Sequence, residues 1–326
     1  MKGPLHVARE LASEMMRRGE DTSDAAVILM GHRLSGSTCF QLGEFSAARA
    51  HLEKGLAQFD PKDRPFYMSV AAQDAKVTML AYLSANLTYL GYLDQARLGS
   101  KAAVEEARRL GHAFNLAHAL HLSCLADFAT CPGERLQAQA DAVIALSEEH
   151  GFSFLRATAT FWRGLAMSEI GLTAEGIAQM KTGLAQYVAT GAVQFVPFVL
   201  TVLADAEGKA KQRDLALGHL LEAEQLLAET DDRWFEAELY RVRGELMGNE
   251  DEYAAAERCF LQAIDIAQRQ SAKLWELRAA ISLARLWRGQ GKRDAARSLL
   301  VPIYDWFTEG FDSPVLQEAK ALLANL

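Results

Sequence analysis

The chain contains little cysteine and proline and has no long apolar run, and each shortage excludes a class of protein. Its four cysteines include no Cys-x-x-Cys pair, which argues against a zinc ribbon or a redox motif. Seven prolines and a hydrophobic content of 50% exclude an extended disordered chain. No apolar stretch is long enough to span a membrane, and the N-terminus lacks the apolar core of a signal peptide. We therefore expect a soluble protein of the reducing cytoplasm, with no membrane partner.

Clustered positive charge is also missing. The 34 Lys and Arg residues are outnumbered by 42 Asp and Glu, so the formal net charge is −8. Basic residues mostly alternate with acids, a pattern typical of solvated helix faces. A nucleic-acid partner is not expected, because phosphate binding needs grouped Lys and Arg side chains.

What the sequence does contain is a repeat of 40 residues. Residues typical of helix-ending turns recur at Gly111, Gly151, Gly191, Asp231 and Ser271. Small residues recur in the same register, at Ser84, Cys124, Gly164, Ala204, Gly244 and Ala284. Self-similarity of this length is typical of a solenoid of helical hairpins, in which each hairpin buries its apolar face only against its neighbours.

The first hairpin carries the clearest signature of the repeat type. Gly36 is followed by the turn Gly43-Glu44-Phe45, then by Ala48 and Leu52. This order of residues resembles the tetratricopeptide repeat, in which small residues let the two helices of a hairpin approach closely. We expect Leu52 to fill the gap toward the next unit. Two prolines in 60–65 predict an irregular loop after this hairpin.

The resemblance implies an all-α, right-handed superhelical solenoid of about seven tetratricopeptide-like hairpins with a capping helix at each end. A single repeat domain is expected over 1–326. Its expected parts are an N-terminal helix at 4–19, hairpin units at 24–59, 73–110, 113–150, 153–190, 193–230, 233–270 and 273–309, and a C-terminal capping helix at 313–326. The N-terminal helix has no partner upstream, so end-to-end assembly of the solenoid is one hypothesis.

The last third of the chain narrows the resemblance. The segments 234–246, 272–287 and 306–312 are similar to the C-terminal repeat region of multidomain bacterial adenylate/guanylate cyclase-like ATPases. That resemblance implies the sensory or interaction arm of a signalling protein. The sequence lacks Gly-x-x-x-x-Gly-Lys-Ser/Thr and the paired metal-binding aspartates of a cyclase, so neither the activities nor a cofactor are expected here.

Stacked tetratricopeptide units would line a concave groove with their first helices. The side chains expected there are Arg33, Ser37, Tyr89, His118, His121, Leu125, Phe161, Thr201, Asp205, Arg241 and Glu245. Arg278, Arg285 and Arg288 add a basic stripe beside Trp287, which either docks an acidic segment or pairs with nearby acids such as Glu276. All of these residues are alternatively the ordinary mixed lining of a superhelix.

His118, His121 and Cys124 stand three residues apart, a spacing that metal sites use. Cys124 occupies the small packing position of its unit, however, and no metal site is expected. The sequence also has no Gly-x-Ser-x-Gly, and no catalytic residues are expected. We expect a non-catalytic scaffold that binds a protein or peptide in its groove, with cyclase or ATPase modules as possible partners. A small-molecule effector sensor is the alternative.

Overall fold

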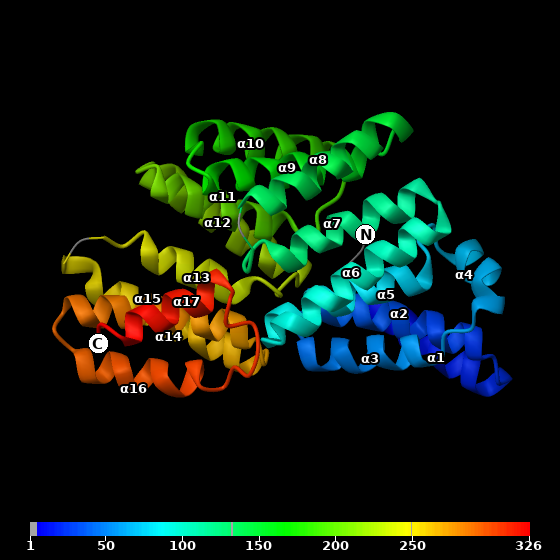
Figure 1. Ribbon diagram of the computed structural model, residues 1–326, viewed down its shortest axis with the longest axis horizontal. Coiled ribbons are helices and arrows are strands. Elements are labelled where there is room, and N and C mark those ends of the chain that lie inside the picture. The colour runs from blue at the N-terminus through cyan, green and yellow to red at the C-terminus, as the bar shows by residue number, and fades with distance from the viewer. Residues whose placement is uncertain (1–4, 132, 249) are drawn as a thin grey trace.

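The computed structural model describes residues 5–131, 133–248 and 250–326, and these residues form helices and no strand (Figure 1). The α-helices are α1 (Leu5–Thr22), α2 (Ala25–Gln41), α3 (Phe45–Ala57), α4 (Arg64–Val70), α5 (Ala75–Leu90), α6 (Leu93–Leu110), α7 (Ala113–Asp127), α8 (Gly133–His150), α9 (Ser153–Glu169), α10 (Thr173–Ala189), α11 (Val196–Lys209), α12 (Arg213–Thr230), α13 (Glu236–Glu245), α14 (Tyr253–Arg269), α15 (Lys273–Gly289), α16 (Arg293–Tyr304) and α17 (Pro314–Leu323). Short 3-10 turns lie at Pro61–Asp63 (η1) and Glu250–Glu252 (η2).

Consecutive helices pack as hairpins, and the hairpins stack along the chain. The prediction of an all-α, right-handed helical-repeat solenoid is confirmed. Each hairpin range proposed from the sequence holds one pair of packed helices, from α2 with α3 to α15 with α16. The exact division into units remains a proposal.

The 40-residue register has a simple backbone cause. Gly111, Gly151 and Gly191 end their helices with φ angles of 67°, 73° and 76°, and Asp231 and Ser271 take the same left-handed conformation at 55° and 57°. A left-handed residue stops a helix and turns the chain back, and glycine adopts it without strain. The repeated turn residues therefore fix where each second helix ends.

Small residues set how closely the helices of a hairpin approach. A methyl group on Gly164 of α9 would lie 2.6 Å from the backbone nitrogen of Met180 and 2.7 Å from the carbonyl oxygen of Gly176, both in α10. In the first hairpin Gly36 faces the side chain of Leu52. Gly36 therefore leaves room for Leu52 within its own hairpin, and the expectation that Leu52 fills the gap toward the next unit stays a prediction.

The two ends of the solenoid are covered. The expected start of the N-terminal helix at residue 4 lies outside the described residues, and the helix continues to Thr22. It packs on α2, where Gly31 lies against Met16, so α1 has a partner within the chain. At the other end α17 buries Val315 and Leu316 against the last hairpin. The loop expected at 60–65 is instead η1 followed by the short helix α4.

The superhelix closes on itself. The backbone nitrogens of Arg233 and Trp234 donate to the carbonyl oxygen of Gln41 at 2.8 and 3.1 Å. The segment after α16 reaches α6, where Arg97 pairs with Asp312 at 2.7 Å. Figure 1 shows the same closure, with the yellow-to-red helices beside the blue and cyan ones. The expectation that each hairpin packs only against its neighbours is therefore wrong.

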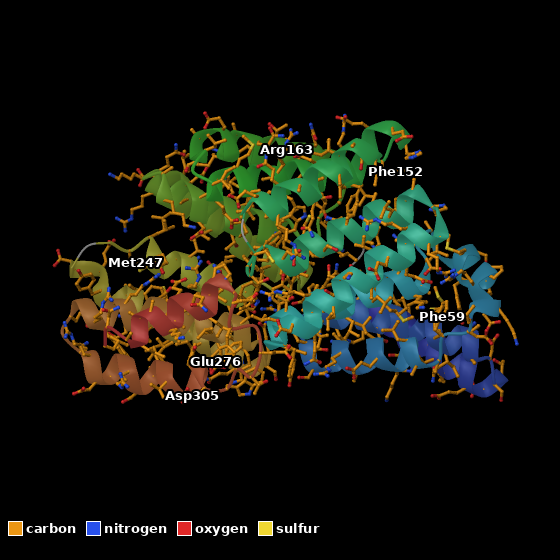
Figure 2. The ribbon with its side chains drawn as sticks, in the orientation of Figure 1. Phe59, Phe152, Arg163, Met247, Glu276 and Asp305 are labelled. Carbon is orange, nitrogen blue, oxygen red and sulfur yellow. The ribbon has the colours of Figure 1, made fainter. Side chains whose placement is uncertain are left out.

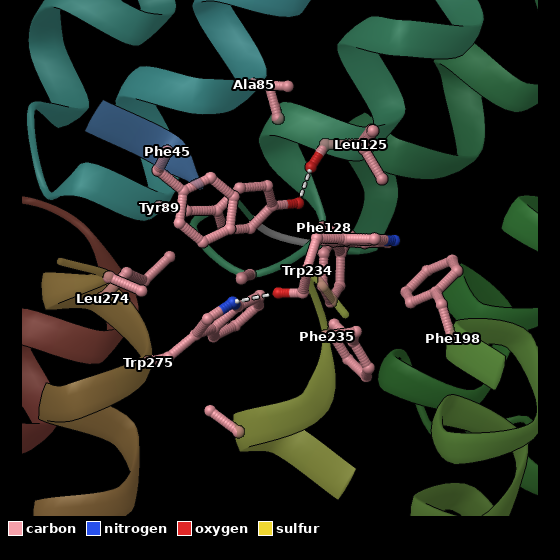
Figure 3. Packing of buried hydrophobic residues seen from close by; sticks show 14 of the residues in the cluster. Phe45, Ala85, Tyr89, Leu125, Phe128, Phe198, Trp234, Phe235, Leu274 and Trp275 are labelled. Atoms are coloured by element: carbon pink, nitrogen blue, oxygen red, sulfur yellow. Dashed lines mark hydrogen bonds between the residues drawn. The ribbon is translucent and has the colours of Figure 1, made fainter. Parts of the chain in front are cut away.

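Large aromatic side chains bring the distant units together. We call these residues the aromatic cluster; they are Phe40, Tyr89, Phe128, Phe198, Trp234, Phe235 and Trp275. Figure 3 shows all of them except Phe40 with labels. Tyr89 of α5 stacks on Trp275 of α15 with ring centroids 4.7 Å apart. The indole nitrogen of Trp275 donates to the carbonyl oxygen of Trp234 at 3.1 Å. The hydroxyl of Tyr89 donates to the carbonyl oxygen of Leu125 at 2.5 Å. The cluster occupies the centre of the superhelix.

Candidate functional site

The concave side of the superhelix is divided into separate pockets. Side chains fill the centre of the molecule (Figure 2), and the aromatic cluster is part of the largest buried hydrophobic core. A cavity of about 590 Å³ and an adjoining one of about 340 Å³ lie toward the C-terminal units. A third cavity, of about 230 Å³, lies among the N-terminal units. We call the first two together the charged groove and the third the histidine pocket.

The charged groove is built from first helices of consecutive hairpins. Its polar lining residues come from α11, α13 and α15, with contributions from α9, α12 and α17: Ser168, Glu169, Thr201, Asp205, Lys209, Arg213, Glu238, Arg241, Glu245, Arg278, Ser282, Arg285 and Glu318. Asp205, Glu245 and Arg285 are spaced 40 residues apart, as are Glu238 and Arg278. The repeat therefore brings equivalent positions of neighbouring first helices side by side at one site.

Arg241 is the centre of an ion-pair network on the groove floor. Its Nε donates to Glu238 at 2.9 Å, and its terminal nitrogens lie 3.5 Å from Glu245 and 3.6 Å from Asp205. Burial opposes its charge, but the three carboxylates raise the pKa of Arg241 above its ordinary value. Burial also opposes the charge of Glu238, yet Arg241 and Arg278 lower the pKa of that carboxyl. The network is ionised at neutral pH and holds its side chains in defined positions.

The lining of the larger cavity holds more basic than acidic side chains. Lys209, Arg213, Arg241, Arg278 and Arg285 lie there with Asp205, Glu245 and Glu318. Outside this lining, Arg278 pairs with Glu238 at 3.0 Å and Arg213 pairs with Glu252. Arg285 pairs with Glu318, and both side chains remain substantially exposed, at 50% and 39%. A basic opening in a chain whose net charge is −8 is a local feature that the overall composition does not reveal.

The structure gathers most of the predicted groove residues into two places. Thr201, Asp205, Arg241, Glu245 and Arg285 line the charged groove. Thr201 is only 1% exposed, and its hydroxyl donates to the carbonyl oxygen of Pro197. Thr201 is therefore part of the groove wall, and its hydroxyl donor is already used within the chain. The other group is in the histidine pocket, which is lined by Arg33, Ser37, His118 and His121.

Other predicted groove residues lie elsewhere. Tyr89 is 0% exposed inside the aromatic cluster, because its ring meets the distant Trp275, and its assignment to an open groove is wrong. Arg288 is exposed on α15 and lines none of these cavities, so its part in docking an acidic segment stays a prediction. Phe161 and Leu125 are buried beside a gap of only about 30 Å³, where they serve packing.

Sequence reasoning missed several residues of these pockets. Glu238 could have been found from Arg278, which stands one repeat later in the same register. Gln73 and Gln194 in the histidine pocket carry no such signal, because they lie in connections between hairpins, where the period is lost. Glu276, a candidate partner of the basic stripe, instead pairs with Lys273 at 2.6 Å.

The spacing of His118, His121 and Cys124 does not assemble three metal ligands. Cys124 is 0% exposed in the hydrophobic core, while Nδ1 of His121 accepts a hydrogen bond from the indole of Trp162 at 3.3 Å. Within the described ranges no group of three or more His, Cys, Asp or Glu side chains has the arrangement of a metal site. No helix within these ranges combines the length and the apolarity that crossing a membrane requires.

Fold and pockets together define a helical-repeat protein that presents binding cavities on the concave side of a closed superhelix. The chain matches no protein-family model. Its fold has counterparts of known structure: a Rap protein complexed with Competence and Sporulation Factor matches with a TM-score of 0.67 at 12% identity, over 96% of this chain and 81% of that one. Aspartyl phosphate phosphatase F from Bacillus subtilis has a TM-score of 0.54 at 13% identity, over 87% and 72% of the two chains. At such identities the likeness shows the fold alone.

A curated protein is similar in sequence. "Uncharacterized protein R02095" of Rhizobium meliloti (strain 1021) is 27% identical over 252 residues, which are 76% of this chain and 24% of that protein. The chain therefore spans about a quarter of the length of this relative.

Proposed function

We propose that the chain is a non-catalytic scaffold that binds an acidic peptide segment of a partner protein in the charged groove. The observation that carries this proposal is the basic surplus around the 590 Å³ cavity, on first helices held by the buried Arg241 network. Arginine forks on rigid helices are suited to carboxylates, and charged clamps along a groove are one mode of peptide recognition. The Rap protein solved with Competence and Sporulation Factor supports the idea, because its fold is similar.

We further propose that the scaffold serves regulation in the cytoplasm of a bacterium, as the interaction or sensory arm of a signalling protein. The length of the Rhizobium meliloti relative supports this, because most of that protein lies outside the matching region. Modules of the cyclase or ATPase type, on the same or another chain, are the partners that the sequence resemblance favours. Binding in the groove would act on them through the helices that line it.

The test uses a library of short acidic peptides and their neutral amide counterparts, with binding measured by fluorescence anisotropy at low and high salt. Arg285→Glu should weaken acidic-peptide binding at least about tenfold, because a basic rim residue becomes acidic. The matched control is Arg288→Glu, a change of the same charge on the same helix outside the cavity, which should have less than about a twofold effect. Both positions are exposed, so neither variant should lose its fold.

The proposal fails if the protein does not prefer acidic peptides over their amides. It also fails if the two arginine variants weaken binding equally, since long-range charge rather than the groove would then explain the preference. High salt should reduce binding by wild type more than by Arg285→Glu.

The alternative function is a small-molecule effector sensor. The observation in its favour is the histidine pocket, which is smaller than the charged groove and has several aromatic and aliphatic side chains in its walls. Pockets of this kind are suited to compact ligands rather than to peptides.

A further inference from the structure

The histidine pocket lies between first helices of the N-terminal hairpins. Its volume is about 230 Å³. Its polar lining is Arg33, Ser37, Gln41, Gln73, Thr78, Tyr82, His118, His121, Tyr187 and Gln194, and its apolar lining is Leu34, Phe114, Leu122, Phe154, Leu155 and Phe195. This volume is below the usual range for drug-sized ligands, so the pocket fits only a compact molecule.

Arg33 enters this pocket without a carboxylate partner. One terminal nitrogen donates to the side-chain oxygen of Gln73 at 3.0 Å, whereas Nε is buried and has no hydrogen-bond partner among the described residues. No described carboxylate forms an ion pair with Arg33; Asp74, which attracts it at longer range, lies 2.8 Å from Arg64. Arginine stays protonated in proteins, so the pocket holds a positive charge that the chain itself does not neutralise.

His118 adds a second free polar atom. Its Nε2 is buried and has no hydrogen-bond partner in the part of the chain that the structure describes, and its ring stacks parallel to Phe114. Burial, with smaller contributions from His121 and Arg33, lowers the pKa of His118 to about 3, so the imidazole is neutral at pH 7. The hydroxyl of Thr78 and the side-chain oxygen of Gln41 also lack partners within the described part of the chain. Buried polar atoms usually have partners, and here four residues of one small pocket do not.

The charge in the pocket selects the type of anion. Arg33 is the only Lys or Arg in its lining, and the two histidines that line it are neutral at pH 7. A single fixed positive charge matches a monoanion, whereas a phosphate dianion would leave charge unpaired in a buried place. The apolar walls provide contacts for a short hydrocarbon or aromatic body.

We propose that the histidine pocket binds a small organic monocarboxylate, with its carboxylate on Arg33 and its apolar body against the Phe114 and Phe154 side of the pocket. The guanidinium donates from Nε, and Nε2 of neutral His118, as an N–H tautomer, donates to the same carboxylate. The neutral-polar groups Thr78 and Gln73 complete the lining around the head group. This proposal is independent of peptide binding in the charged groove.

The test measures binding of benzoate, butyrate and phenylacetate to the full chain, each beside its uncharged amide, by calorimetry and by the shift in thermal midpoint. At least one acid should bind, with its amide weaker by about tenfold or more, because the charged hydrogen bond to Arg33 is lost. Inorganic phosphate is the competing probe and should not displace the acid. Equal binding of acid and amide, displacement by phosphate, or no binding of any acid at about 10 mM would overturn the proposal.

Two variants locate the site. Arg33→Gln should abolish acid binding without lowering the thermal midpoint, since it removes a buried charge that lacks a counter-ion. Arg49→Gln, at an arginine of α3 that pairs with Glu53, should leave binding unchanged. Arg33→Lys should retain part of the affinity. If Arg33→Gln binds the acids normally, or Arg49→Gln loses binding as well, the pocket is not their site.

The two proposals can fail separately. Arg285→Glu should keep acid binding in the histidine pocket, and Arg33→Gln should keep peptide binding in the charged groove. Loss of both activities in either variant would show that one site had been mistaken for two, and would overturn the assignment of the acid to the histidine pocket.

Discussion

Truncating Trp275 to alanine should open the closure between the N-terminal and C-terminal units. The side chain is 0% exposed, stacks on Tyr89 at 4.7 Å and lies edge-to-face with Phe235 at 5.2 Å. Removing a buried tryptophan costs about 3–5 kcal/mol from lost transfer energy and the cavity left behind. The carbonyl of Trp234 also loses its indole donor, which adds about 1 kcal/mol. The free energy of unfolding of Trp275→Ala should therefore be about 4–6 kcal/mol lower than that of the wild type.

The assay is guanidinium unfolding followed by circular dichroism, with small-angle scattering on the folded variant. Trp275→Phe separates the contribution of ring packing from that of the hydrogen bond, because it keeps a ring on Tyr89 and loses only the hydrogen bond and part of the side-chain volume. Its free energy of unfolding should be lower by about 1–2 kcal/mol. Leu98→Ala is the control, since that side chain is 70% exposed and its truncation should change stability by less than about 0.5 kcal/mol. Where Trp275→Ala stays folded, its radius of gyration should exceed that of wild type.

A loss below about 1 kcal/mol for Trp275→Ala would refute the closure, because a tryptophan on an open concave surface has little buried area to lose. An unchanged scattering profile in a strongly destabilised variant would show that the ring stack supports local packing. The closure would then depend on the contacts of Gln41 and of Arg97 with Asp312.

Two further predictions concern packing and pH. Gly164→Ala should destabilise the protein by about 1–3 kcal/mol, because the added methyl meets the backbone of α10. Gly218→Ala has open space around the added methyl and should stabilise the protein by about 0.5–1 kcal/mol. Urea unfolding midpoints that move in the same direction for both variants would contradict this. Burial lowers the pKa of His118 to about 3 and of His121 to about 4, below their ordinary 6.5. The unfolded chain therefore binds more protons at these two histidines below pH 6.5, and together they should lower the free energy of unfolding by about 4 kcal/mol from pH 7 to pH 5. Burial raises the pKa of Glu169 and of Asp232 to about 7, and these carboxyls act in the opposite direction over the same range. His118→Gln should therefore remove about half of the histidine contribution, about 2 kcal/mol, from the difference between pH 7 and pH 5; a difference unchanged in His118→Gln would contradict the assignment.

The periodic part of the fold could be predicted from the sequence because its causes are local. A left-handed residue at Gly111 or Asp231 ends a helix whatever surrounds it, and a small residue at Gly164 sets the approach of two helices adjacent in the chain. Both effects repeat every 40 residues. They specify which face of each first helix points inward, and that is why Asp205, Arg241 and Glu245 could be placed together in advance.

The closure could not be predicted in this way. The period shows that Tyr89 points inward, but whether it meets solvent or a distant unit depends on the summed twist and rise of several hairpins. Small changes per repeat, such as the short α13 or the extra helix α4, accumulate along the solenoid. Trp234 and Trp275 both pack on Tyr89, so the segments that they join are far apart in the sequence.

In the closed superhelix, the free energy of burial determines which inward-facing side chains lie at the centre and which lie beside a cavity. Aromatic rings such as Phe198 and Trp275 gain free energy when water leaves them, and they meet at the centre. Charged groups such as Asp205 and Arg285 lose hydration when buried, so they remain where the curvature leaves space. Arg241 and Arg33 are two cations near the centre, and they differ in whether carboxylates of the same chain compensate their charge. Arg241 is compensated by three carboxylates of its own chain, whereas Arg33 forms no ion pair with any described carboxylate and is the residue through which we expect a ligand to be held.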